Sequence, residues 1–272
     1  MIMDCRTKYP VLMVHGMGAR DRKWPNYWGR IPKALKSKGA RLFFGNQDSN
    51  GSVEENALVV KNSLLRALNE SGAEKVNIIA HSKGGLEARY LISSMGMADR
   101  IASLTTISSP HNGSATMDFV MKIPTPLMKF GCGIADLWFR ILGDKKPDTY
   151  SCLKSFTTDQ AREFNIQNPD DPKVFYQSYA FVMKRWNSDL FMWFPHFIVS
   201  IFEGDNDGLL APDAVKWTNF RGVFSGAGRK GVSHCQQVDL YRHKLPVDID
   251  GRIMDITDFY AEIVDGLREM GY

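Results

Sequence analysis

Continuous apolar segments that alternate with helical patterns are the feature that most limits the fold of this chain. A strand with apolar residues at consecutive positions is buried on both faces, which is typical of a parallel sheet covered by helices. The sequence predicts such strands at Tyr9–Val14, Lys75–Ala80 and Ile101–Ile107. Between them we expect a short strand near 40–44. Three helices are expected: one at about 27–38, one that runs from the capping box at 52–55 to Gly72, and one at 86–95. The alternation predicts an α/β fold, with a mostly parallel central sheet and helices on both faces.

The second half of the chain keeps this alternation less regularly. Residues 115–150 contain prolines, glycines and large apolar side chains but no strand pattern. Strands are predicted again at Lys173–Phe181 and near Phe197–Phe202. The last helix begins at about Ile256, with apolar residues at helical spacing. Because no repeat or linker separates these parts, residues 1–272 are predicted to form a single domain.

Composition and charge argue against several classes of protein. The 272 residues are 44% hydrophobic and 24% charged, and the net charge of +4 is not gathered into a basic block that would bind nucleic acid. The most apolar segment, Leu190–Phe202, is too short to span a bilayer. No signal-peptide pattern precedes the first strand, which predicts a cytoplasmic protein; a secreted protein without its signal peptide would have the same sequence. The cysteines are far apart, so free thiols are expected, with a Cys132–Cys152 disulfide as the alternative.

Ser82 stands where a buried strand meets a helix, in the stretch NIIAHSKGGLEARY. A nucleophilic serine requires a tight turn with little side-chain bulk two residues to either side, and those positions are Ala80 and Gly84. The following helix directs its N-terminal dipole at the serine. The alternative for this motif alone is a serine that only caps the helix.

An acid and a base follow in the order that such a nucleophile requires, each in a loop after a strand. Asp205 and Asp207 lie in FEGDNDGLL, just past an apolar segment, and Gly208 favours Asp207 by allowing the chain to bend after it. His234 lies in the glycine-containing loop before the last helix, and His243 is its rival. The three remaining candidates, His81, His111 and His196, fit the order poorly.

Six motifs in order give the chain a resemblance to a known family. The segments YPVLMVHG, KVNIIAHSKGGLEARY, LTTISSPHNGS, SFTTDQAREFN, GDNDGLL and GVSH resemble the bacterial triacylglycerol lipases of the α/β-hydrolase superfamily. The similarity extends over nearly the whole chain and weakens at 117–150 and 182–196. It implies the α/β-hydrolase fold, with Ser82 as the nucleophile, Asp207 as the acid and His234 as the base.

The resemblance also implies an oxyanion site. Its donors would be the backbone amides of Met17, after the first strand, and Lys83, after the nucleophile, while His15 is expected to be structural. Many of these lipases hold a structural calcium, with an aspartate two residues after the catalytic histidine. Here that position is Gln236, a weaker ligand for a hard cation, and Asp239 has the wrong spacing. No metal or cofactor is therefore predicted.

Together these features predict a serine carboxylester hydrolase that acts on lipid esters, at a lipid–water interface. A short- or medium-chain esterase or an acyltransferase would have the same triad, and a non-catalytic binder on this fold would have lost part of it. Residues 117–150 are predicted to form a lid that Pro124, Pro126, Gly131 and Gly133 divide into short helical pieces, with the apolar segment Phe191–Phe197 as a facing wall. The alternative is an extra pair of core helices.

Overall fold

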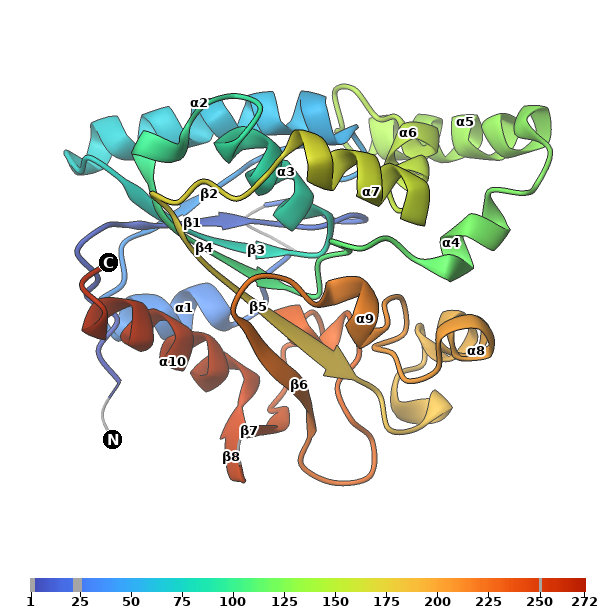
Figure 1. The fold of residues 1–272 in the computed structure, drawn as a ribbon. Coiled ribbons are helices and arrows are strands. Elements are labelled where there is room, and N and C mark those ends of the chain that lie inside the picture. Colours follow the sequence, from blue (N-terminus) through green and yellow to red (C-terminus); the bar gives the residue numbers. More distant parts are fainter. Residues whose placement is uncertain (1–2, 22–25, 250) are drawn as a thin grey trace.

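A computed structural model describes residues 3–21, 26–249 and 251–272 (Figure 1). Within these ranges the centre of the molecule is an eight-stranded sheet, in the order β2-β1-β3-β4-β5-β6-β7-β8. Strands β1 to β6 are parallel, and β7 and β8 extend one edge as an antiparallel hairpin. This arrangement confirms the predicted α/β class. The strands are β1 (Val11–Val14), β2 (Leu42–Phe44), β3 (Val76–His81), β4 (Ile101–Ile107), β5 (Phe175–Val182), β6 (Phe220–Gly226), β7 (Pro246–Ile249) and β8 (Arg252–Asp255).

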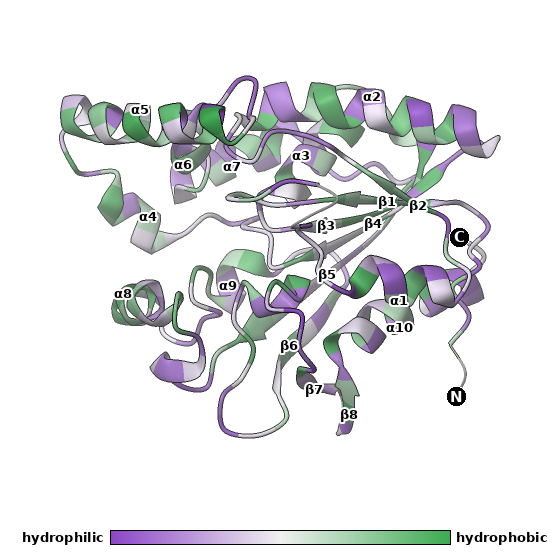
Figure 2. Cartoon of the chain, turned by 180° about the vertical axis from the view of Figure 1, so that it is seen from behind, coloured by the Kyte–Doolittle hydropathy of each residue, from purple (hydrophilic) through white to green (hydrophobic). Residues whose placement is uncertain are grey.

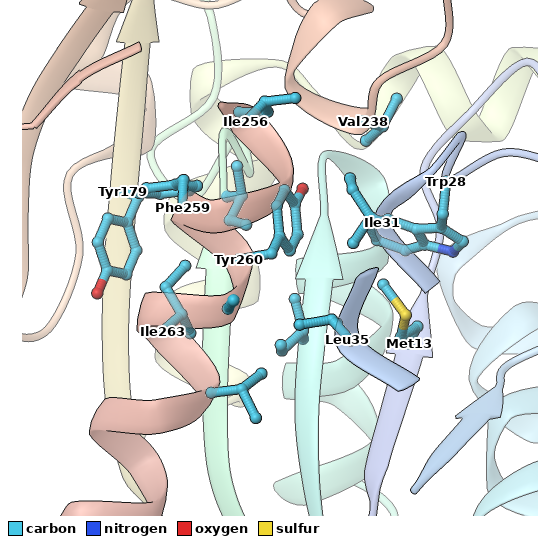
Figure 3. Packing of buried hydrophobic residues seen from close by; sticks show 14 of the residues in the cluster. Met13, Trp28, Ile31, Leu35, Tyr179, Val238, Ile256, Phe259, Tyr260 and Ile263 are labelled. Atoms are coloured by element: carbon cyan, nitrogen blue, oxygen red, sulfur yellow. The ribbon is translucent and has the colours of Figure 1, made fainter. Parts of the chain in front are cut away.

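Helices cover both faces of the sheet, as Figure 1 shows. Helices α2 (Val53–Ser71) and α3 (Lys83–Ile92) lie on one face, and α1 (Ile31–Ser37) and α10 (Ile256–Glu269) lie on the other. Alternate residues of β1 serve the two layers, since Val11 and Met13 belong to one buried cluster and Leu12 and Val14 to the other. Figure 3 shows the first cluster, where Met13 and α1 meet the apolar face of α10.

Local sequence signals explain where the longer helices begin and end. Ser52 caps α2 by accepting a hydrogen bond from the amide of Glu55 at 3.3 Å, and Gly72 ends the helix with a left-handed φ of 69°. Helix α1 begins four residues later than predicted, at Ile31, with a proline in its first turn. Tyr27 and Trp28, which the prediction placed inside this helix, are buried in the core before it.

A group of helices lies beyond the carboxyl ends of the parallel strands. In Figure 1, α4, α5 and α8 extend past the sheet at the same end of the molecule. No helix within the described ranges is both long and apolar enough to cross a membrane. The helices and 3-10 turns not yet named are η1 (Ala98–Arg100), α4 (Ala115–Val120), α5 (Thr125–Ile141), α6 (Thr149–Lys154), α7 (Thr158–Gln167), η2 (Trp186–Ser188), α8 (Trp193–Glu203), α9 (Pro212–Val215) and η3 (Gln236–Val238).

Two predictions for this end of the molecule are wrong. The strand expected near Phe197–Phe202 is part of helix α8, because Pro195 lies in the first helical turn, where its missing N–H is not needed. Gly131 and Gly133 do not divide their segment, since α5 continues through both as a 17-residue helix. Proline 126 stands in the first turn of α5, and the break between α4 and α5 lies just before it.

Candidate active site

Ser82 occupies a strained turn between β3 and α3. Its backbone has φ 53° and ψ −130°, a region that residues with a side chain rarely adopt. The amide of Ser82 donates a hydrogen bond to the carbonyl of Ile107 at the end of β4, 2.9 Å away. This bond holds the turn at the carboxyl edge of the sheet, where Ser82 is 9% exposed.

Glycines allow the neighbouring backbone to approach this turn. A side chain at Gly84 would come within 2.5 Å of the carbonyl oxygens of Val14 and His15, so only glycine lets α3 pack this closely against the end of β1. A side chain at Gly16 would lie 2.7 Å from Cβ of Ser82. The loop that carries Met17 therefore lies directly beside Ser82, and Lys83 is the first residue of α3.

His234 and Asp207 come together from two separate loops. Nδ1 of His234 lies 2.8 Å from Oδ2 of Asp207, and the amide of His234 also donates to the carbonyl of Asp207 at 2.7 Å. The ring of His234 lies against His81, the residue before Ser82, with 4.5 Å between the ring centroids. The structure thus brings the predicted acid and base together beside the turn of the predicted nucleophile.

The carboxylate of Asp207 is fully buried and accepts four hydrogen bonds. Oδ2 accepts from His234 and from Nε2 of Gln237, and Oδ1 accepts from the amides of Leu209 and Leu210. Burial alone would raise the pKa of Asp207, but the charge of His234 and the hydrogen bonds from His234 and the amides of Leu209 and Leu210 lower it to about 2. Asp207 is therefore ionised at neutral pH.

The alternative candidates for the acid and the base do not take part in the contact between Asp207 and His234. Asp205 is exposed, two residues from the buried Asp207. His243 is also exposed and stacks on Tyr241. His15 is buried, with its ring nitrogens near the backbone oxygens of Gly16 and Gln47, as a structural histidine requires.

Sequence reasoning missed a buried chain of hydrogen bonds that leads away from Asp207. Gln237 donates to Asp207 at 2.7 Å through Nε2, so its Oε1 is free to accept from Nε2 of His81 at 3.2 Å. Nδ1 of His81 then accepts from the hydroxyl of Tyr27 at 2.6 Å. Burial and the neighbouring charge of His234 lower the pKa of His81 well below its ordinary value, which keeps this histidine neutral. No sequence motif links these residues, because they meet only in the folded chain.

Lys83 forms an ion pair with Glu87 in the interior of the protein. Both side chains are fully buried, and Nζ of Lys83 lies 2.8 Å from Oε1 of Glu87 and 2.7 Å from the carbonyl of Gly51. Although burial opposes it, the charge of Glu87 keeps the pKa of Lys83 above its ordinary value. The pair could have been predicted from the sequence, because two residues of opposite charge four positions apart on one helix lie side by side.

The residues near His234 do not fit a calcium ion. Oε1 of Gln236 accepts a hydrogen bond from the amide of Ser233 at 2.9 Å, and the carboxylate of Asp239 is paired with Arg30 at 2.7 Å. Both groups already have protein partners. Among the described residues, no three His, Cys, Asp or Glu side chains gather in a way that would hold a metal. Cys132 and Cys152 are free thiols.

Comparison with known proteins places this geometry in a family. A family model described as palmitoyl protein thioesterase matches residues 10–168, more than half of the chain, including Ser82. Triacylglycerol lipase 2 of Saccharomyces cerevisiae is 31% identical over 273 residues, which cover 93% of this chain and 78% of that protein. The chain belongs to the triacylglycerol lipase family.

Other relatives of this lipase-family chain agree. A triacylglycerol lipase of Pseudarthrobacter phenanthrenivorans is 33% identical over 184 residues, which cover 60% of this chain and 54% of that protein. The crystal structure of the Staphylococcus hyicus lipase has the same fold, with a TM-score of 0.69, 16% identity and 97% of both chains covered. The predicted enzyme class, a carboxylic ester hydrolase with the α/β-hydrolase fold, is confirmed.

Proposed function

We propose that this chain hydrolyses lipid esters, with acylglycerols as the substrate class, through an acyl-enzyme on Ser82. The observation that carries the proposal is the bond between His234 and the buried Asp207, beside the strained turn of Ser82. Because Asp207 is ionised, it holds the histidine proton on Nδ1, which leaves the lone pair of Nε2 available as a base.

The reaction then follows from the roles of these three side chains. Oγ of Ser82 attacks the ester carbonyl carbon while Nε2 of His234 takes its proton. Collapse of the tetrahedral intermediate breaks the bond to the alcohol, which leaves with the proton from His234. Water attacks the acyl-enzyme in the same way, with His234 again as the base, and releases the fatty acid and the free serine.

Two backbone amides are proposed to stabilise the negative oxygen of each intermediate. The amide of Lys83 belongs to the first turn of α3, where N–H groups have no partner within the helix. The amide of Met17 belongs to the loop against Ser82. Preorganised donors at this position are the largest single contribution in many hydrolases, worth roughly 3 kcal/mol each.

Exposed apolar side chains around this end of the molecule support a lipid substrate. Figure 2 shows hydrophobic residues along α5 and α8, which lie on either side of the strand ends. On α5 they include Leu127, Phe130, Leu137, Trp138 and Ile141; on α8 and the loop before it they include Leu190, Phe191, Phe194, Phe197 and Ile201. All are at least half exposed. Exposed apolar patches of this kind mark surfaces that bind a membrane, a ligand or another protein, and a lipid substrate fits the first two.

The segment of α4 and α5 is proposed to act as a lid over the site. Only Cys132 is buried on α5, which argues against the alternative that this helix belongs to the core. Phe119 of α4 contacts Phe202 of α8 with 4.9 Å between ring centroids, so the two apolar parts meet at α4. The break at Pro124, between α4 and α5, is the natural hinge.

The experiment that tests the proposal is Ser82→Ala. We expect hydrolysis of p-nitrophenyl esters to fall by about 10⁴-fold or more, with an unchanged unfolding midpoint, because Ser82 contributes chemistry and little packing. A serine-reactive phosphonate should label the unaltered protein at Ser82 only. Labelling that persists in the alanine variant would show that another residue is the nucleophile. A series of p-nitrophenyl esters of increasing acyl length would then define the chain-length preference.

A further inference from the structure

A cavity of about 550 Å³ is lined by residues that flank His234 in the sequence, Gly231 before it and Gln236 after it. We call it the basic hollow, because its rim carries Arg229, Lys230, His243 and Lys244, all of them exposed. On its other side the hollow is lined by Leu190 and Phe191, from the apolar segment that leads into α8. The mechanism proposed above uses none of these side chains.

The basic side chains on the rim of the hollow are not paired with Asp189, the carboxylate that lines it. Arg229, Lys230 and Lys244 form no ion pair with any acidic side chain of the described residues. The carboxylate within the hollow belongs to Asp189, which is buried. It already accepts from Ser233 at 2.5 Å, from Tyr241 at 2.8 Å and from the amides of the two residues that follow Leu190.

Sequence and backbone both fix this arrangement. Residues 227–246 contain four Lys or Arg and one acidic residue, Asp239, whose carboxylate is paired with Arg30. The carbonyl of Lys230 accepts hydrogen bonds from the amide of Lys184, at 3.1 Å, and from the hydroxyl of Ser188. These bonds hold the loop that presents Arg229 and Lys230 in a defined place. The hollow is therefore a built cationic cavity rather than a scatter of surface lysines.

The apolar side of the hollow indicates which anion it fits. Leu190 is 80% exposed and Phe191 is 69% exposed, and the apolar surface continues along α8. An anionic group that carries hydrocarbon beside its charge matches both sides, whereas a nucleic acid needs a long cationic stripe without such an apolar edge. A phospholipid headgroup at a lipid surface has this combination of phosphate and acyl chains.

We propose that the basic hollow binds the headgroup phosphate of an anionic phospholipid and so docks the protein on negatively charged lipid surfaces. The hollow includes Gln236, two residues after His234, so a lipid surface held there lies beside the catalytic residues. The inference deepens the proposed function, since the same surface would present the ester. Its binding step does not depend on hydrolysis.

The test measures binding to vesicles with the Ser82→Ala variant, so that no lipid is consumed. Vesicles of phosphatidylcholine alone are compared with vesicles that also contain phosphatidylglycerol. We expect tighter binding to the anionic vesicles, and a loss of about 25-fold in affinity when Arg229→Gln and Lys230→Gln are combined, because each basic residue near an anionic surface contributes about fivefold. The matched control is Lys33→Gln with Lys36→Gln on α1, two exposed lysines outside the hollow, which should change the affinity little.

Three results would overturn the proposal. The first is equal binding to neutral and anionic vesicles, and the second is unchanged affinity in an Arg229→Gln, Lys230→Gln variant that keeps its unfolding midpoint. The third is a protein that inorganic phosphate stabilises against heat but that gains nothing from phosphatidylglycerol, because the hollow would then be a site for a free anion. Anionic vesicle binding by a chain that hydrolyses no ester would refute the proposed function and leave this inference standing.

Discussion

Replacement of Asp207 by asparagine tests the centre of the proposed mechanism. The carboxylate accepts two hydrogen bonds on each oxygen, from His234 and Gln237 on one side and from two backbone amides on the other. Asparagine has only one acceptor oxygen. Whichever way its amide turns, its NH₂ group faces two donors, so two of the four bonds cannot form as they do with the carboxylate.

The orientation that keeps the two backbone bonds is the harmful one for catalysis. The NH₂ group would then donate to Nδ1 of His234, and the proton of the imidazole would move to Nε2, where the base is needed. We expect kcat/KM on a soluble p-nitrophenyl ester to fall about 10⁴-fold, equivalent to about 5.5 kcal/mol of transition-state stabilisation. The control is Asp205→Asn, an exposed residue two positions away, which should change kcat/KM by less than about threefold.

The same substitution has a predicted effect on the pH dependence of stability. The pKa of Asp207 is lowered from its ordinary value of 3.8 to about 2 in the folded protein. The folded state is therefore stabilised by about 2 kcal/mol above pH 3.8, and this contribution is lost as the pH falls through about 2. Denaturant unfolding of Asp207→Asn between pH 2 and 7 should not show this pH-dependent contribution to the free energy of unfolding. For catalysis, less than about a tenfold loss of kcat/KM in Asp207→Asn, or a larger loss in Asp205→Asn than in Asp207→Asn, would refute the assignment of Asp207 as the acid.

Three further predictions concern packing and the lipid surface. Gly84→Ala should lower the free energy of unfolding by about 3 kcal/mol or prevent folding, because its methyl group would come within 2.5 Å of two backbone carbonyls; denaturant titration measures this. Glu87→Gln should cost about 3–5 kcal/mol by leaving Lys83 buried without its partner, and adding Lys83→Met should recover part of that loss. Trp138→Ser should reduce hydrolysis of emulsified long-chain esters about tenfold and leave soluble short-chain esters nearly unchanged, with Leu65→Ser on α2 as the exposed apolar control. Equal losses on both substrates would favour a fixed role for α5.

The amino-terminal half of the fold was predictable because local signals and burial agree there. Each local signal there indicates a single kind of structure: the continuous apolar segments indicate buried strands, Ser52 indicates a helix start and Gly72 a helix end. The structure confirms them. The segment of α8 has no such signal, since a short apolar stretch reads equally well as a strand or a helix. The antiparallel hairpin of β7 and β8 was missed because its residues are partly exposed and lack a long apolar pattern.

The candidate site was predictable in part, because Ser82 directly follows β3. Asp207 follows helix α8 and not the strand that its apolar segment suggested, and a bond from the amide of Met183 to the carbonyl of Asn206 brings it to the end of β5. Ser82, Asp207 and His234 lie in loops at the carboxyl edge of one sheet, where residues distant in the sequence must meet. The hydrogen-bonded chain from Gln237 through His81 to Tyr27 could not be predicted in this way, because it depends on how η3, the end of β3 and the segment before α1 pack on one another. Lys83 and Glu87 show the opposite limit: their spacing predicts a pair, but only the fold reveals that the pair is buried.

The loop of His234 is held in place by the protein's own side chains at both of its ends. Before the histidine, Ser233 donates to the buried carboxylate of Asp189. After it, Asp239 binds the guanidinium of Arg30, which reaches it from the segment just before α1. Each carboxylate is nearly buried and has several donors, so moving the loop would leave unsatisfied charge in the interior. These two anchors make the loop rigid, and they explain how the proposed catalytic base is held in position beside a neutral Gln236.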